Sequence, residues 1–465
     1  MIKTIGGSHV SRYHRRLAGE SASTLAGVIG RLIPKDGMIR LRTGTKRRRV
    51  FTPVVTFWNF LAQTLSPGQA CRETVQRVQA ARGRRRQSAI SSATGAYCRA
   101  RHKLPIPLLA SLWPSMASAL DTRTPTTRLW LGLRVAVLDG STLSMPDTPE
   151  NQAEWPQSST QKPGCGFPVM KLLAVFSLAS GALHAIAIGS LHNAEHALLQ
   201  TPSVKAALAQ FDVALGDRIF GSFVTFWRLI VDGRHGVFRM HQGRKIDWRK
   251  GKCLGPNDRV MTWIKPLKHS WTGPNPLPEF ITVRVLRFTI AAPGFRTRMV
   301  VLVTDLLDPI RYPAHALAEL YLARWRVELF LRDIKITLGM DILRCLTPPM
   351  ILRELHMHLI AYNAIRALMA DAADRAPTPL DRISFKGTCD AIRQWAPDLA
   401  ATALAGPSRY AKLLCLFFRA IAGNRVPWRP ERSEPRAVKR RPKNYHLLTK
   451  PRHLMGNLPH RNRPH

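Results

Sequence analysis

The stretch LYLARWRVELFLRDIK, residues 320–335, gathers tyrosine, cations and glutamate among large apolar side chains. On a helix with about 100° between residues, its polar side chains fall within about 60° of one another. That polar face consists of Tyr321, Arg324, Glu328 and Lys335. An adjoining apolar stripe, which we expect to pack on the rest of the protein, consists of Ala318, Leu322, Trp325, Leu329 and Ile336. A solvated face with i,i+4 ion pairs would give the same pattern, so this helix alone does not decide a function.

The charge balance of the whole chain points to a polyanionic partner. The 465 residues include 70 Lys and Arg against 29 Asp and Glu, a formal net charge of +41. Without a partner of opposite charge, such a protein would repel itself strongly. A membrane surface would also attract this charge, but the cations are spread along the chain rather than gathered beside an apolar anchor. We therefore expect nucleic acid, and no membrane, as the partner.

Cysteine usage and the N-terminus indicate an intracellular protein. The seven cysteines form no CxxC pair, which is typical of free thiols in a reducing compartment and argues against structural zinc on cysteine. The first twenty residues lack the apolar core of a signal peptide. The longest apolar run, residues 172–191, is interrupted by Ser180, Gly181 and His184, so we interpret it as two buried strands joined by a turn.

Changes in pattern along the chain predict an α/β protein of five segments. The first is helical and basic, with two arginine-rich tracts, and is typical of a DNA-binding region. An α/β region is interrupted by a hairpin-rich β insertion and then resumes with helices, and the last segment is a basic, extended tail. The expected boundaries are 1–120, 121–235, 236–304, 305–423 and 424–465.

Two aspartates stand where short apolar strands are expected to end. Asp139 follows LRVAVL and Asp217 follows DVALG, positions at which side chains line the carboxyl edge of a sheet. Singly, an aspartate that opens a turn is usually a cap. Glu328 adds weight, because the apolar stripe of its helix should dock on the same sheet. Three carboxylates brought together raise one another's pKa unless cations lie between them, which favours two Mg²⁺ or Mn²⁺ ions.

The spacing Y-x2-R-x3-E-x6-K is met in full and resembles the Y-R-E-K signature of bacterial DDE transposases of the insertion-sequence-four family. VLDGST, LGDRIF and RDIKITLGMDILRC resemble the remaining blocks of that family. The resemblance implies a ribonuclease-H-like catalytic domain with a β-rich insertion between the second aspartate and the glutamate. It also implies that Asp139, Asp217 and Glu328 bind the metals. Tyr321, Arg324 and Lys335 would then contact phosphates of the transposon end.

The activity implied by this resemblance is transposition. Such an enzyme binds the inverted ends of its element in double-stranded DNA, hydrolyses one strand, and joins the freed 3′-hydroxyl to target DNA. The resemblance further implies a homodimer in the synaptic complex and a place in the bacterial cytoplasm, at the nucleoid.

The chain departs from the family pattern in its second block. Ile219 follows Asp217 and Arg218 where relatives usually have glycine. A β-branched residue would be strained if that turn required a positive φ. A decayed copy that binds DNA without cutting it, or an inhibitor of transposition, is therefore an alternative. The tryptophan that stacks on a flipped base in relatives is also unassigned, with Trp248, Trp263 and Trp271 as candidates that core packing would explain equally.

A second motif competes with the first. HNAEH, residues 192–196, satisfies the H-x-x-E-H pattern of inverted zincins, with His192 and His196 as ligands and Glu195 as base. So short a match arises easily by chance, a zinc peptidase needs a third ligand, and it gives no reason for the positive charge. This alternative remains remote.

Overall fold

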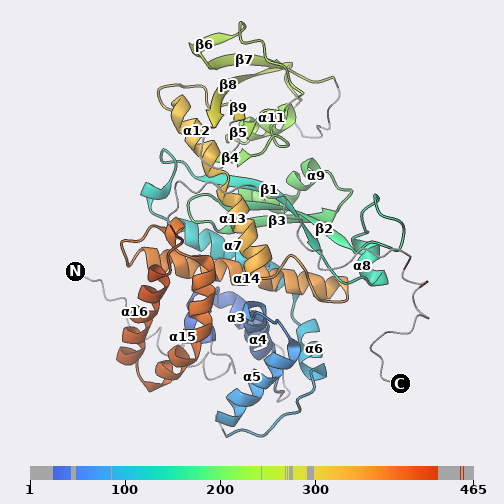
Figure 1. The fold of residues 1–465 in the computed structure, drawn as a ribbon, viewed down its shortest axis with the longest axis vertical. Coiled ribbons are helices and arrows are strands. Elements are labelled where there is room, and N and C mark those ends of the chain that lie inside the picture. Colours follow the sequence, from blue (N-terminus) through green and yellow to red (C-terminus); the bar gives the residue numbers. More distant parts are fainter. Residues whose placement is uncertain are drawn as a thin grey trace.

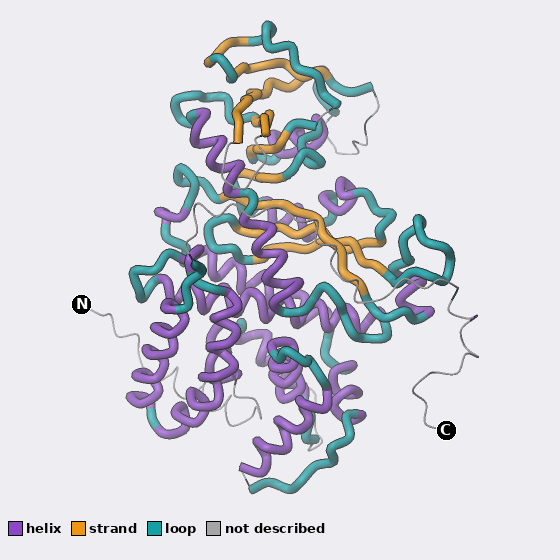
Figure 2. The backbone as a smooth tube through the Cα atoms, in the orientation of Figure 1, coloured by secondary structure: helices purple, strands orange, loops and turns teal. Residues whose placement is uncertain are grey.

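The computed structural model describes residues 25–42, 49–84, 86–241, 243–267, 269, 271, 276–290, 298–427, 451 and 454. One mixed sheet of nine strands forms the upper part of the molecule, and helices form the lower part (Figures 1 and 2). The strand order is β3-β2-β1-β4-β5-β9-β8-β7-β6. The α/β class expected from the sequence is therefore confirmed. Most of the first arginine-rich tract and of the basic tail lies outside the described residues.

The first five strands build the half of the sheet nearest the helices. Three of them run antiparallel, and two further strands continue the sheet parallel to the first. They are β1 (Val135–Ser144), β2 (Val169–Ser177), β3 (Leu183–Ser190), β4 (Val213–Gly216) and β5 (His235–Arg239). β2 and β3 confirm the interpretation of residues 172–191 as two strands. Gly181 has φ +71 in the turn between them, a conformation that glycine adopts without a steric cost.

Four further strands extend the same sheet rather than forming a separate layer. They are β6 (Lys252–Gly255), β7 (Asp258–Ile264), β8 (Phe280–Ile290) and β9 (Arg298–Thr304). β9 pairs with both β8 and β5. Arg284 on β8, almost fully buried, binds Asp258 at 2.5 Å and donates to the Tyr312 carbonyl at 2.7 Å. This buried ion pair ties the added strands to the segment that leads to the opening stretch.

Helices form the N-terminal region, as expected. They are α2 (Leu25–Ile29), α3 (Lys35–Arg42), α4 (Pro53–Leu65), α5 (Cys71–Arg84), α6 (Gly95–His102) and α7 (Ile106–Thr122). The C-terminal helices are α14 (Pro348–Ala373), α15 (Phe385–Ala405) and α16 (Pro407–Gly423). α14 is buried along most of its length because α4, α7, α15 and α16 all pack on it (Figure 1).

Shorter helices lie between the strands or, in the case of the last two, between the last strand and α14. They are α8 (Pro149–Glu154), α9 (Glu195–Leu199), α10 (Pro202–Leu208), α11 (Phe223–Val231), α12 (Ala314–Ala323) and α13 (Arg326–Arg332), followed by a π-helix, η3 (Asp333–Thr337). Three 3₁₀ turns complete the set: η1 (Gly30–Leu32), η2 (Thr126–Arg128) and η4 (Leu380–Arg382). None of the helices in the described ranges is long and apolar enough to cross a membrane.

The sheet separates two hydrophobic cores, because successive side chains of a strand point to opposite faces. Val137 and Leu215 belong to the larger core, which includes α14 and α13. Leu138 and Ala214 belong to the smaller core, which includes α9, α10 and α11. Successive residues of one strand therefore pack against different sets of helices.

Candidate active site between β1, β4 and α13

Asp139 on β1 and Asp217, which directly follows β4, occupy matching positions relative to these neighbouring parallel strands. The pairing of β1 with β4 ends at Val137 opposite Leu215. Each aspartate lies two residues further along its own strand direction. Side chains alternate along strands, so both carboxylates continue the rows of Val137 and Leu215 toward the face that α13 covers.

β1 does not end at Asp139, which corrects the sequence-based expectation. The strand continues to Ser144, and its pairing with β2 runs without a break from Ala136 to Ser144. The partner that ends is β4, whose last strand residue is Gly216. Asp139 therefore lies at the level where β4 has ended while β2 still pairs with β1. Strand propensity along β1 cannot locate this point, because it depends on where the neighbouring strand ends.

The opening stretch is not one continuous α-helix. α12 ends at Ala323, Arg324 and Trp325 form a turn, and α13 begins at Arg326 before it passes into the π-helix η3. Glu328 lies in the first turn of α13, and α13 packs on β1. Phe330 of the same helix contacts Phe176 of β2 with ring centroids 5.5 Å apart. The packing of α13 on the sheet thus brings Glu328 to the strands that hold the two aspartates.

The face of this helical segment that packs is the opposite of the one expected. Tyr321, Arg324 and Val327 are buried. The predicted packing stripe is instead largely exposed: Leu322 is 41% exposed, Trp325 37%, Leu329 48% and Ile336 47%. The expectation failed because both faces contain apolar residues, so the pattern did not decide between them, and Glu328 itself remains exposed at the edge of the packed face.

The electrostatics of Asp139 show that the three carboxylates interact. The pKa of Asp139 is raised from its usual 3.8 to about 6, chiefly by burial. The charges of Glu328 and Asp217 contribute to this rise, whereas Arg324 and the Gly140 N–H, 2.9 Å from Oδ1, oppose it. Burial is the largest of these effects, and Arg324 partly offsets the repulsion from the two neighbouring carboxylates.

Of the three other signature residues, two lie behind the carboxylates. Arg324 is 7% exposed, and its guanidinium lies 5.5 Å from the ring centroid of Tyr321 and 5.1 Å from that of Trp325. Its Nε is buried without a hydrogen-bond partner. Tyr321 is 3% exposed, and burial raises the pKa of its hydroxyl. The expectation that Tyr321 and Arg324 contact phosphates of the DNA therefore stays a prediction.

Lys335 links the helical segment to β1. Its Nζ donates to the Ser141 hydroxyl at 2.9 Å and to the Thr142 carbonyl at 2.8 Å. Both acceptors follow Asp139 on the same strand. The π-helix places Lys335 on the side of the segment that faces β1, so this lysine fixes η3 against the strand.

The donors of the carboxylate trio suit a divalent metal, but a closed ligand shell is not formed. Across the described ranges, no three Asp, Glu, His or Cys side chains lie close enough together to hold a metal ion. The trio does offer oxygen donors and excess negative charge, the combination that Mg²⁺ and Mn²⁺ prefer. Donor chemistry therefore fits the metals expected from the sequence.

Ile219 is not strained. The non-glycine residues with positive φ in the described ranges are Gln69, Arg86 and Leu131, so Ile219 has a negative φ. Its turn is closed by a hydrogen bond from the Phe220 N–H to the Asp217 carbonyl at 3.1 Å. The side chain is 43% exposed. The turn after Asp217 does not require a positive φ at Ile219, so this residue does not strain the turn.

The competing HNAEH motif does not form a helical ligand pair. α9 begins at Glu195, and His192 lies in the turn before it. The Glu195 carboxylate packs on β1, since a Cβ added to Gly140 would lie 2.9 Å from Oε1. The sequence did not indicate that Glu195 lies beside Gly140, the residue after Asp139, because Glu195 and Gly140 are far apart along the chain.

The three candidate tryptophans differ in their surroundings. Trp263 is buried and packs edge-on against Phe226, with ring centroids 5.8 Å apart, which is the packing role. Trp248 is half-buried beneath Arg287 at 4.8 Å, and Trp271 beneath Arg228 at 5.1 Å. A base-stacking role for any of them is untested.

Comparison with known proteins identifies the family of the chain. Residues 130–364, half of the chain, match the family described as "Transposase DDE domain". The chain belongs to the DDE transposase family.

Among individual relatives, the transposase InsG of insertion sequence element IS4 from Escherichia coli strain K12 is 26% identical over 430 residues. The match covers 90% of this chain and 91% of InsG. Among solved structures, the piggyBac transposase synaptic complex with hairpin DNA is similar with a TM-score of 0.39 and 10% identity. That similarity covers 88% of this chain and 81% of the piggyBac chain.

Proposed function

We propose that this protein is an active transposase of an insertion sequence. In this proposal it binds the inverted ends of its element in double-stranded DNA and cleaves one strand by metal-dependent hydrolysis. The 3′-hydroxyl that is freed then attacks target DNA. Asp139, Asp217 and Glu328 hold two Mg²⁺ or Mn²⁺ ions, which would activate the attacking oxygen and stabilise the leaving one.

The main support for this proposal is the matched register of two aspartates beneath a helix that bears the glutamate. Asp139 and Asp217 continue paired rows of adjacent parallel strands, and Glu328 interacts electrostatically with Asp139. A structural role would not need Asp139 to be buried near two further carboxylates that raise its pKa. The cost of that repulsion is understandable if a bound cation offsets it.

The sheet order supports a ribonuclease-H-like catalytic domain. Strands β1 to β3 form an antiparallel meander, β4 and β5 add parallel to β1, and α13 covers the face of the carboxylates. Within this proposal, the strands β6 to β9 are the β-rich insertion between the second aspartate and the glutamate. The five segments with boundaries at 120, 235, 304 and 423 remain our proposed division.

The positive charge supports double-stranded DNA as the partner. The net charge of +41 suits binding to phosphates along an extended duplex. The described part of the N-terminal segment is helical, and α5 has Arg82 and Arg84 in its last turn. We propose that this segment binds DNA, that two copies assemble on paired ends, and that the protein acts at the bacterial nucleoid.

A cleavage assay with the ends of the element that encodes the protein tests this proposal. The purified chain is incubated with end-containing duplex DNA and Mg²⁺, alongside Glu328→Gln and Asp217→Asn. Both substitutions keep size and remove one charge, so end binding should persist while nicking at the element boundary falls at least about 100-fold. Glu319→Gln, an exposed site on α12, is the matched control.

The alternative of a decayed, DNA-binding copy makes a different prediction. It expects wild-type protein to bind ends without nicking them in Mg²⁺ or Mn²⁺. If both carboxylate variants nick DNA as fast as wild type does, the assignment of the triad is refuted.

A further inference from the structure

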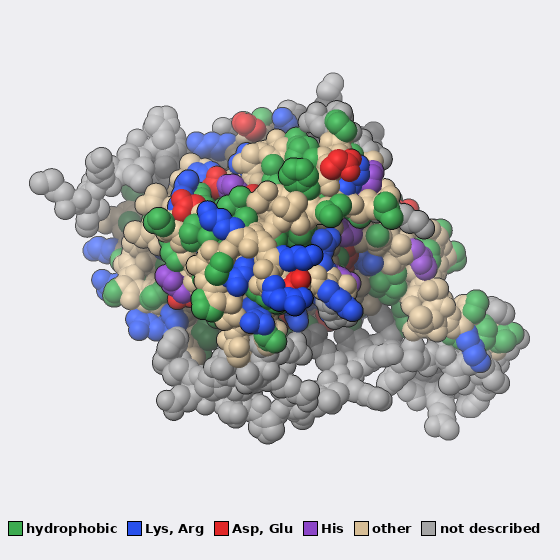
Figure 3. Space-filling model, turned by 90° about the horizontal axis from the view of Figure 1, so that it is seen from above, with side chains coloured by type: hydrophobic (Ala, Val, Ile, Leu, Met, Phe, Trp, Pro, Cys, Tyr) green, Lys and Arg blue, Asp and Glu red, His purple; other side chains and the backbone are tan. Residues whose placement is uncertain are grey.

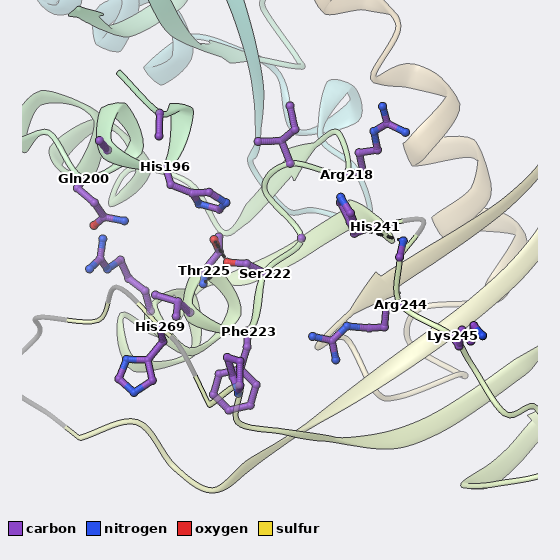
Figure 4. A pocket seen from close by; sticks show the side chains of 18 residues that line it. His196, Gln200, Arg218, Ser222, Phe223, Thr225, His241, Arg244, Lys245 and His269 are labelled. Atoms are coloured by element: carbon purple, nitrogen blue, oxygen red, sulfur yellow. Dashed lines mark hydrogen bonds between the residues drawn. The ribbon is translucent and has the colours of Figure 1, made fainter. Parts of the chain in front are cut away.

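A basic cavity opens at the carboxyl end of β4, next to the turn that follows Asp217. It has a volume of about 1150 Å³ and is lined by the turn after β4, the ends of α9 and α11, and loops of the added strands (Figure 4). Arg218 and Ile219, which line it, directly follow Asp217. The cavity thus begins next to the backbone of Asp217, but it lies on the face of the sheet covered by α9 and α11, across the end of β4 from the carboxylates, which face α13.

The lining charges are all of one sign. Four cations line the cavity, and none of its 18 lining residues is Asp or Glu. The cations and imidazoles are Arg218, Arg228, Arg244, Lys245, His196, His241 and His269. Figure 4 shows His196 and His241 on different walls. So many cations without a carboxylate favour an anionic ligand.

Two further features strengthen the attraction for an anion. The first turn of α11, with Phe223 and Val224, forms part of the wall, so the positive end of the helix dipole faces the cavity. Nη1 of Arg228 is buried without a hydrogen-bond partner. Burial also lowers the pKa of Arg228 and Arg244, which an anion would reverse.

Size and layout identify the kind of anion. The cavity is only slightly larger than sites for drug-sized ligands, so its volume suits one extended strand better than a whole duplex. Its cations come from three separate segments: the turn at Arg218, the helix at Arg228, and the loop at Arg244 and Lys245. Such spacing suits consecutive phosphates of one strand better than a single isolated phosphate.

We infer that this cavity binds the phosphodiester backbone of a short unpaired DNA strand that extends from the cleavage site. The inference rests on the proposed function, because it places that strand next to Asp217. The strand can come from the DNA that flanks the element or from the complementary strand of the element's end. Both present the same phosphates, and the polarity of the strand distinguishes them.

The test compares binding of blunt and overhanging DNA by the full chain. Fluorescence anisotropy in EDTA uses three duplexes of the element boundary: blunt, with a three-nucleotide 5′ overhang, and with a three-nucleotide 3′ overhang. Wild type should bind one overhang at least about 5-fold more tightly than the blunt end. The overhang that gains affinity identifies the strand.

Lys245→Gln and Arg244→Gln, singly and together, should remove this preference and leave affinity for the blunt duplex within about 2-fold. Each lost phosphate contact should also reduce the salt slope by about 0.7. Lys250→Gln, an exposed lysine outside the cavity, is the control. Because Arg244 covers the ring of Trp263 at 3.9 Å, Lys245→Gln alone, at an exposed position, keeps the test valid if Arg244→Gln unfolds.

Equal affinity of wild type for all three duplexes would overturn the inference, as would a variant that weakens blunt and overhanging DNA equally. Neither result depends on cleavage. A protein that nicks ends but shows no overhang preference refutes the cavity alone. A protein that prefers overhangs but never nicks refutes the proposed function alone.

Discussion

Asp139 should destabilise the metal-free protein at neutral and alkaline pH, so Asp139→Asn should stabilise it. The carboxyl has a pKa of about 6 in the folded chain against its usual 3.8. That difference corresponds to about 3 kcal/mol when converted at 1.36 kcal/mol for each pH unit. Asparagine removes the buried charge and can still accept the Gly140 N–H, which Asp139 Oδ1 accepts at 2.9 Å.

The sign of the pH dependence follows from linkage. The folded-state pKa is raised, so folding disfavours the ionised carboxyl, and the penalty grows as pH rises from about 4 to about 6. Above that window the penalty is complete, about 3 kcal/mol, and at pH 5 it is about half as large. The gain from Asp139→Asn should therefore be about 1 to 3 kcal/mol at pH 8 and clearly smaller at pH 5.

Urea unfolding in EDTA at pH 8 and pH 5 measures this effect, with Glu319→Gln as the control for loss of an exposed carboxylate. Mg²⁺ should reverse the order at pH 8, because a metal at 1,000 times its Kd stabilises wild type by about 4.1 kcal/mol and the variant lacks a ligand. A variant that is no more stable than wild type at pH 8, or that gains equally at both pH values, would refute the reasoning.

Three further outcomes follow from the site. Replacement of Arg324 by Met, which keeps the bulk, should move the acid limb of the cleavage rate to higher pH, because the guanidinium lowers the pKa of Asp139; an unmoved limb would contradict that role. Lys335→Met should lower the free energy of unfolding by about 1 to 2 kcal/mol through loss of the bonds to Ser141 and Thr142, and an unchanged urea midpoint would show that they add nothing. Ile219→Gly should give no gain in nicking and should cost about 0.5 to 1 kcal/mol of stability through backbone entropy; a rise in nicking of several-fold would restore the idea of a strained turn.

The sequence by itself determined the family and much of the inventory of elements. The spacing of Tyr321, Arg324, Glu328 and Lys335 identified the family, and the family match over residues 130–364 confirms it. Strong local signals were also sufficient for the hairpin of β2 and β3, because a turn between two apolar runs needs no distant partner. The helical N-terminal region was equally visible from its apolar spacing.

Only the tertiary structure decided how those elements face one another. Helical periodicity located two faces on residues 320–335 but could not tell which one packs, and the face that packs is that of Tyr321 and Arg324. Propensity placed a strand before Asp139 but could not show that β1 outlasts β4 and continues to Ser144. The cavity beside Asp217 joins segments that are separated along the chain. In each case the deciding free energy comes from contacts between distant residues, which a local pattern does not contain.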